Sequence, residues 1–204
     1  GEVNTVILAV NSAGLAHGDH SCGITISDSL AVNNPQEVSV TLHVNATLNV
    51  PTDYGKIQAG IDAAVDGDVV LVASNTYKGV GNRDLDFKGK AITLKSEDGP
   101  EQCIIDCEFS GSGVTFQSGE GQDSILVGFT ITNGSPDKSY GLYSDTLSSP
   151  TIQDCVVTDC LDDAILCEGD ITLQNCTVRN SGHGGAYSGG IYCRSGVGVI
   201  RDCE

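Results

Sequence analysis

The chain contains 204 residues, of which 39% are hydrophobic and 5% aromatic, with 26 glycines, nine cysteines and neither methionine nor tryptophan. Its formal net charge of −17, with only ten Lys and Arg residues, excludes a nucleic-acid partner, whose phosphates would have to be neutralised by cations. No apolar stretch is long enough to insert into a membrane, and an acidic, solvated exterior is typical of an extracellular or cell-surface protein.

The first part of the chain, residues 1–48, is expected to form antiparallel strands. Apolar and polar residues alternate in three stretches, at 6–10, 23–27 and 38–44. This part resembles the C-terminal half of bacterial immunoglobulin-like modules of the BACON type, in residues 12–18 and 33–36. The resemblance implies a partial immunoglobulin-like β-sandwich, whose open edges must be covered by preceding residues or by another chain.

A group of metal-binding residue types lies in the loop before the second of these stretches. His17, Asp19 and His20 place two imidazoles and a carboxylate close together, and such ligands suit a transition metal. These three residues are therefore the candidate metal ligands. A loop with incidental metal affinity is the simpler interpretation, because the strand beginning at Cys22 would turn that thiol away.

The second part, residues 49–204, opens with a short linker and a helix expected at about 54–66. Four apolar residues recur there at helical spacing, at Ile57, Ile61, Ala64 and Val65. Asp66 and Gly67 end the segment before an apolar run. We expect this helix to cap the open end of the structure that follows it.

One short pattern then recurs five times, at intervals of 21 to 27 residues. In each copy, apolar residues lie on both sides of Asp, Gly or Asn, which is typical of two short strands that meet at a bend. A period of this length indicates a solenoid. The copies begin at Ile104, Leu126, Ile152, Leu173 and Ile200, whose side chains we expect to point inward and stack. Because the last copy stops at Glu204, we expect the native polypeptide to be longer.

A second series recurs between these copies, beginning at Gly113, Gly141, Ala164 and Gly190. If Ile165 and Ile191 face the core, strand alternation turns Tyr143, Leu166 and Tyr192 outward on successive coils. Exposed tyrosine rings in one row can stack on sugar rings. Tyr143 and Tyr192 are therefore the candidate carbohydrate-binding residues, although a covering loop or a neighbouring subunit would also explain them.

The cysteines follow the same repeat. One position is shared by Cys107, Cys155, Cys176 and Cys203, and another by Cys167 and Cys193. Because neighbouring strands lie about 4.8 Å apart, equivalent cysteines would form a ladder of small buried side chains. Disulfides between neighbouring coils are the alternative in an oxidising compartment.

Residues 50–204 resemble the right-handed parallel β-helix proteins of the pectate-lyase-like superfamily. The resemblance is carried by residues 57–72, 76–77 and 89–94, and residues 128–134 and 149–152 match secreted bacterial members. It implies an all-β fold, a right-handed parallel β-helix solenoid with an N-terminal capping helix. The same coil serves lyases, hydrolases, adhesins and structural proteins, so the resemblance leaves the activity open.

Two further motifs resemble those of polygalacturonases: the paired Asp162 and Asp163, and the glycine-histidine-glycine sequence around His183. An inverting glycosidase needs one carboxylic acid to protonate the leaving oxygen and one carboxylate to activate water. By resemblance, Asp162 and Asp163 would be these catalytic carboxylates and His183 would assist them. The third aspartate of that family is missing, because Tyr140 and Gly141 stand where it is expected.

These observations favour a secreted or cell-surface structural or adhesive scaffold with carbohydrate contact. Two alternatives stay open: a polygalacturonase-like hydrolase acting on an acidic polysaccharide, and a subunit of an extracellular polymer or filament. The expected partner is a polysaccharide or another surface protein, and the incomplete sandwich or the β-helix ends would be the contacts of a homo-oligomer. No cofactor is required, but the acidic exterior could bind Ca²⁺, which prefers oxygen ligands.

Overall fold

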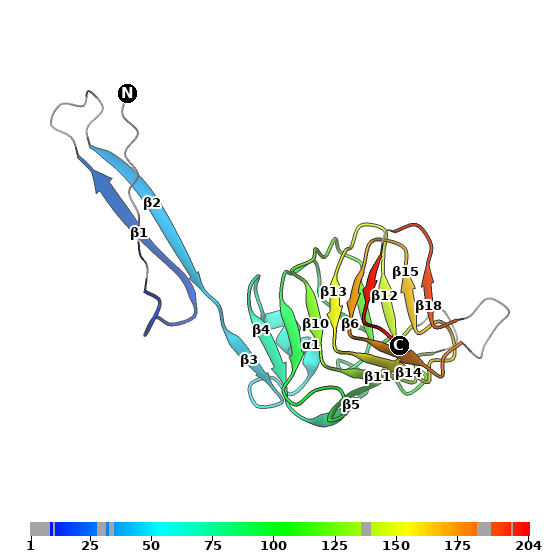
Figure 1. Cartoon of the computed structure of the whole chain (residues 1–204). Helices are drawn as coiled ribbons and strands as arrows, with labels where there is room; N and C mark the ends of the chain where they lie inside the picture. The colour runs from blue at the N-terminus through cyan, green and yellow to red at the C-terminus, as the bar shows by residue number, and fades with distance from the viewer. Residues whose placement is uncertain are drawn as a thin grey trace. The chain divides into compact units, whose positions relative to one another are not determined.

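The computed structural model describes residues 9, 11–27, 32, 35–135, 140–182, 189–196 and 198–204 (Figure 1). The chain folds as two compact units, Gly1–Ala46 and Thr47–Glu204. No helix among the described residues is long and apolar enough to cross a membrane.

The described residues of the first unit contain one antiparallel pair of strands, β1 (Gly18–Ile26) and β2 (Gln36–Val44). Most of the stretch at 6–10, expected as a further strand, lies outside the described residues. Ala9, which is described, is exposed and belongs to no strand. The immunoglobulin-like and BACON-type assignment of this unit therefore stays a prediction.

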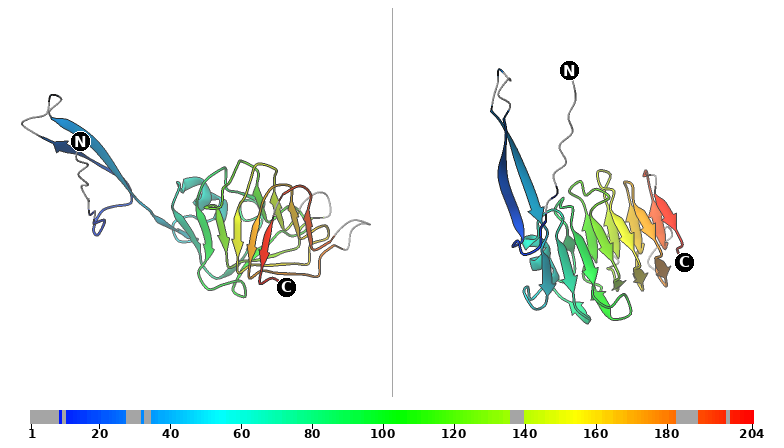
Figure 2. Two further views of the ribbon diagram at one scale, coloured as in Figure 1. Left: turned by 45° about the horizontal axis from the view of Figure 1, so that its top comes forward. Right: turned by 60° about the vertical axis from the view of Figure 1, so that its left-hand side comes forward.

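The second unit consists of three parallel sheets, which the chain visits in turn (Figures 1 and 2). The first sheet contains β3 (Thr47–Val50), β4 (Val69–Val72), β7 (Thr93–Ser96), β10 (Ile125–Val127), β13 (Thr151–Gln153), β16 (Thr172–Gln174) and β19 (Val199–Arg201). The second contains β5 (Asn75–Lys78), β8 (Cys103–Asp106), β11 (Thr130–Thr132), β14 (Val156–Thr158) and β17 (Thr177–Arg179). The third contains β6 (Leu85–Asp86), β9 (Val114–Phe116), β12 (Leu142–Ser144), β15 (Ile165–Cys167) and β18 (Ile191–Cys193).

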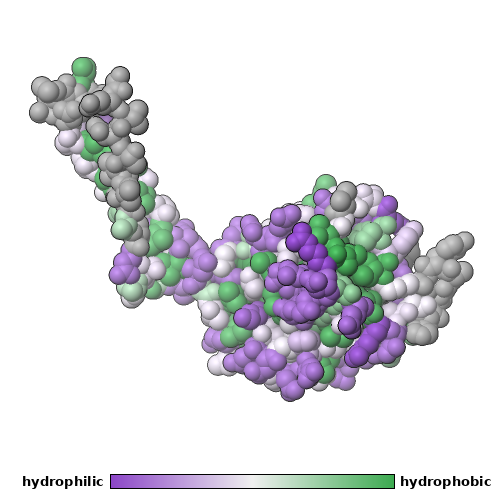
Figure 3. Space-filling view, viewed as in Figure 1, coloured by the Kyte–Doolittle hydropathy of each residue, from purple (hydrophilic) through white to green (hydrophobic). Residues whose placement is uncertain are grey.

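From β4 onward, each strand pairs with the strand that lies three places later in the chain, so every three strands complete one coil. This is a parallel β-helix, and the predicted all-β solenoid is confirmed. In Figure 3, hydrophilic side chains cover much of the visible face of the coils, with hydrophobic areas between them.

The chain turns between the first and second sheets at left-handed corner residues. This position is occupied by Gly128, Asp154, Asn175 and Asp202, each with a φ between 51° and 77°. Gly, Asn and Asp adopt this conformation at little cost, which explains the bend expected from the repeat. The Asn175 side-chain amide donates a hydrogen bond to Asp154 Oδ1 at 2.5 Å, which ties neighbouring corners together.

On the inner face of the first sheet, apolar side chains from successive coils stack on one another. Leu126, Ile152 and Leu173 pair in register and are fully buried, as predicted. Ile200 continues the row, but it is 50% exposed because β19 is the last strand of the sheet.

The prediction for Ile104 is wrong. This residue lies in β8 of the second sheet, opposite Thr130, and it is half-buried, whereas its neighbour Ile105 is buried. The sequence Ile-Ile-Asp-Cys at 104–107 resembles Ile-Gln-Asp-Cys at 152–155, but the two segments occupy different sheets. Similar residues occur there because both segments bring an apolar strand to a turn.

The same error affects the cysteine ladder. Cys155, Cys176 and Cys203 each follow a strand of the first sheet, and the backbone N–H of Cys176 lies 3.4 Å from Cys203 Sγ. Cys107 instead follows β8 of the second sheet and does not belong to this ladder. Cys167 and Cys193 do share a position, as expected, and form a disulfide between β15 and β18.

The helix α1 spans Ile57–Ala63 and is shorter than the expected 54–66. Ile57, Ile61 and Ala64 are buried as predicted, whereas Val65 is exposed. A Cβ added to Gly60 would lie 2.9 Å from Val70 Cγ1, so this glycine lets the helix pack directly on the first sheet.

The C-terminal end of the helix is held by one lysine. The ammonium group of Lys90 donates hydrogen bonds to the carbonyl oxygens of Ile61, Asp62 and Ala64, each at 2.8 Å. These bonds satisfy carbonyl groups that have no partner within the helix, and a cation is favourable at this end of the helix dipole.

We predict that Ile152→Asp lowers the free energy of unfolding by about 4 kcal/mol, because it places an unpaired carboxylate inside the coil. Ile200→Asp is the matched control in the same row and should cost less than about 1 kcal/mol, because that position is half exposed. Chemical denaturation of both variants measures the difference. Equal losses of stability would contradict the burial of this row.

Candidate functional site

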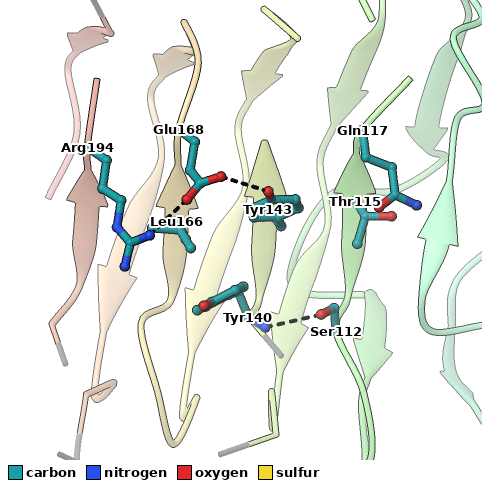
Figure 4. A pocket seen from close by; sticks show the side chains of 8 residues that line it. All are labelled: Ser112, Thr115, Gln117, Tyr140, Tyr143, Leu166, Glu168 and Arg194. Atoms are coloured by element: carbon teal, nitrogen blue, oxygen red, sulfur yellow. Dashed lines mark hydrogen bonds and ion pairs between the residues drawn. The ribbon is translucent and has the colours of Figure 1, made fainter. Parts of the chain in front are cut away.

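A groove of about 450 Å³ lies on the outer face of the third sheet (Figure 4). Its floor follows from strand alternation: Val114 and Phe116 point into the coil, so Thr115 points out. On the next two coils, Tyr143 and Leu166 occupy the position equivalent to Thr115. Tyr143 and Leu166 of the predicted outward row are therefore in register and line the groove with Thr115, although Leu166 is only 4% exposed.

A second row lies two residues further along the chain, directly after β9, β15 and β18. It contributes Gln117, Glu168 and Arg194 to the lining of the groove. Figure 4 shows these polar side chains beside the floor, with Glu168 between Arg194 and Tyr143. One wall of the groove is thus polar, and its floor contains an aromatic ring and an aliphatic side chain.

Two tyrosine rings stack in this groove. The ring centroids of Tyr140 and Tyr143 lie 5.9 Å apart, and the ring planes are inclined by 25°. The backbone N–H of Tyr140 donates a hydrogen bond to Ser112 Oγ at 3.1 Å, which fixes the start of the strand. Tyr140 comes from the segment before β12, so strand alternation does not predict its position.

Glu168 connects Tyr143 of the floor with Arg194 of the wall. The Tyr143 hydroxyl donates a hydrogen bond to Glu168 Oε2 at 3.0 Å, and Arg194 Nη1 donates one to Glu168 Oε1 at 2.9 Å. Burial raises the pKa of Tyr143 to about 12, and the hydrogen bond to Glu168 contributes to the shift. Both carboxylate oxygens of Glu168 are therefore engaged within the protein.

Tyr192, the second candidate carbohydrate-binding residue, continues the outward row opposite Leu166. It is 44% exposed, and the guanidinium carbon of Arg194 lies 5.6 Å from the centre of its ring. This distance suits a cation–π contact. Tyr192 therefore supports Arg194 at the end of the groove, and it is Tyr143 whose ring lines the groove itself.

The two candidate catalytic aspartates lie near Tyr140, which is on the side of the groove opposite Glu168. Burial raises the pKa of Tyr140, and the charges of Asp162 and Asp163 raise it further. Asp163 is buried, and its Oδ1 accepts a hydrogen bond from the backbone N–H of Gly189 at 2.6 Å. Burial also raises the pKa of Asp163, and the charge of Asp162 adds to this effect. Asp163 thus holds the turn that leads into the next coil, while His183 lies outside the described residues.

The candidate metal ligands lie on β1 and in the loop before it. Asp19 Oδ1 accepts a hydrogen bond from His43 Nδ1 on β2, at 2.7 Å. His20 is bonded through Nε2 to the carbonyl oxygen of Ala16, also at 2.7 Å, and neighbouring residues of a strand face opposite sides. In the part of the chain that the structure describes, no three His, Cys, Asp or Glu residues are grouped so that they could hold a metal ion.

Residues 65–204 match the family model described as the right handed beta helix region. Comparison with curated protein sequences gave no match, and comparison with solved structures gave none either.

We predict that Glu168→Gln lowers the pKa of Tyr143 from about 12 towards its ordinary value of 10, because the charge and the charged acceptor are removed. Nuclear magnetic resonance titration of the tyrosine Cζ atoms measures this change. Tyr77, whose pKa burial raises to about 12, is the internal control and should not shift.

The same raised pKa predicts a dependence of stability on pH. Because the folded state holds the Tyr143 proton more tightly than the unfolded state, its contribution is complete below pH 10 and is lost as the pH rises through 12. Glu168→Gln should reduce the loss in this range. An unchanged Tyr143 titration in the variant would show that the hydrogen bond to Glu168 does not form in solution.

Proposed function

The chain belongs to the right-handed β-helix family, and we propose that it is a secreted or cell-surface scaffold that binds a polysaccharide in the groove of its third sheet. The observation that carries this proposal is the pair of stacked rings, Tyr140 and Tyr143, beside fixed polar groups in an open groove. Sugar rings have apolar faces and polar edges, so they suit an aromatic surface flanked by hydrogen-bonding groups.

The shape of the site supports a polymeric ligand. The lining residues come from successive coils, from Thr115 on β9 to Arg194 after β18, so the groove extends along the axis of the solenoid. An extended glycan chain can lie across several strands in this direction. Its rings would meet Tyr143 on the floor, and its hydroxyl groups would meet Gln117 in the wall.

Binding without hydrolysis fits the state of the carboxylates. Both oxygens of Glu168 accept hydrogen bonds from neighbouring side chains, and Asp163 accepts one from the backbone of Gly189. A glycosidase needs two carboxyl groups that face the same glycosidic bond, one as acid and one as base. Residues engaged in holding the wall and a turn are better explained as parts of a rigid binding surface.

We predict that Tyr143→Ala weakens binding of the polysaccharide about 30-fold, which corresponds to about 2 kcal/mol for the loss of a central aromatic contact. Affinity electrophoresis in gels that contain the polymer measures the change. Tyr54→Ala, which removes a partly buried tyrosine near the helix, is the matched control and should bind as the wild type does. Retention of full affinity in Tyr143→Ala would place the binding site elsewhere.

The hydrolase alternative retains one supporting observation, because Asp162 and Asp163 act electrostatically on Tyr140 at one side of the groove. Its test is the release of reducing ends from polygalacturonate, with Asp163→Asn as the variant and exposed Asp123→Asn as the control. We expect no release above the buffer blank. Release that Asp163→Asn abolishes and Asp123→Asn preserves would replace the scaffold proposal with the hydrolase.

A further inference from the structure

Resting on the proposed glycan-binding role, we infer that the groove selects uncharged glycan chains and rejects polymers of uronic acids. The inference deepens the proposed function by naming the class of ligand. The charges around the groove favour uncharged polysaccharides over acidic ones.

Carboxylates surround the groove on several sides. Glu168 stands in the wall, and the charge of Asp145 acts on the Tyr143 ring in the floor. Asp162 and Asp163 act on Tyr140, on the side opposite Glu168. At the end of the groove farthest from Arg194, on β6, Asp86 Oδ2 lies 3.4 Å from the side-chain nitrogen of Gln117. A uronate carboxylate entering the groove therefore approaches several groups of its own charge.

Arg194 is the one cation among the described residues that line the groove. Its guanidinium already donates a hydrogen bond to Glu168 at 2.9 Å and lies over the Tyr192 ring. Because Glu168 already neutralises Arg194, a uronate that reaches the other N–H groups of the guanidinium meets an ion pair with no net charge. The attraction of such a pair for a uronate is weak, and the repulsion from the surrounding carboxylates opposes binding.

The remaining polar groups of the lining suit hydroxyl groups. Gln117 contributes an amide, which can both donate and accept hydrogen bonds, and the Thr115 hydroxyl, which donates to the Leu85 carbonyl oxygen at 3.2 Å, can still accept one. These uncharged groups can exchange hydrogen bonds with a neutral sugar without burying an unpaired charge. The chemistry of the lining thus matches a glucan, mannan or xylan better than a polyuronate.

The experiment compares two sets of polymers by affinity electrophoresis of the whole chain. The uncharged set contains xylan, mannan and mixed-linkage glucan, and the acidic set contains polygalacturonate and alginate. Highly methyl-esterified polygalacturonate is the matched probe, because it keeps the sugar and removes the charge. We expect at least one uncharged polymer to bind, and polygalacturonate to bind at least tenfold more weakly than its methyl ester.

The variant Glu168→Gln tests the electrostatic cause. It removes one carboxylate from the wall and frees Arg194, so the discrimination against polygalacturonate should shrink at least threefold. Glu101→Gln makes the same change of charge at an exposed position in the turn before β8 and should leave the discrimination unchanged. Added salt should also reduce the discrimination in the wild type, because it screens exposed charges.

The possible failures are distinguishable. If no polymer of either set binds, the proposed function is overturned and this inference falls with it. If polygalacturonate binds as tightly as its methyl ester, or more tightly, the groove still binds glycans and the inference alone is overturned. A discrimination that neither Glu168→Gln nor salt reduces would overturn its assignment to the carboxylates of the groove.

Discussion

The left-handed corner residues are the constraint on which the rest of the second unit depends. Gly, Asp or Asn turns the chain at the same place in successive coils, so the strands that follow begin in register. Because the register is kept, equivalent side chains stack. Leu126, Ile152 and Leu173 of the first sheet thus fill the interior of the coil. The same register carries Tyr143 and Leu166 outward together. The groove is therefore a product of the repeat, although its residues differ from coil to coil.

Much of the fold could be predicted from the sequence because a solenoid repeats its constraints. The period indicated the coil, and the series beginning at Gly141 and Ala164 gave the correct register of the third sheet. The prediction for Ile104 was wrong because a cysteine follows an apolar strand at two different corners of the coil, and the repeat pattern does not distinguish them. A short motif therefore predicts that the chain turns, but it does not predict at which corner of the coil the turn lies.

The candidate site was predicted only in part. Strand alternation identified Tyr143, and extending it by two residues would have found Glu168 and Arg194, which share the same outward face. Tyr140 could not be found in this way, because its segment precedes β12 and approaches the groove only when the coil has formed. For the paired aspartates, Asp162 and Asp163, the residue types were recognised in the sequence but their structural setting was not. A motif gives residue types and spacing, but the bond between Asp163 and the Gly189 backbone depends on the conformation of the next coil.

If the groove binds a polymer as proposed, the disulfide between Cys167 and Cys193 has a mechanical consequence. Each of these cysteines directly precedes a wall residue of the groove, Glu168 and Arg194 respectively. A polymer pulled along the solenoid axis would load the backbone hydrogen bonds between neighbouring coils, which can open one after another. The covalent link joins the two coils that hold opposite ends of the ion pair. Tension on the ligand would therefore be shared between β15 and β18, and the wall would keep its spacing while it carries the load.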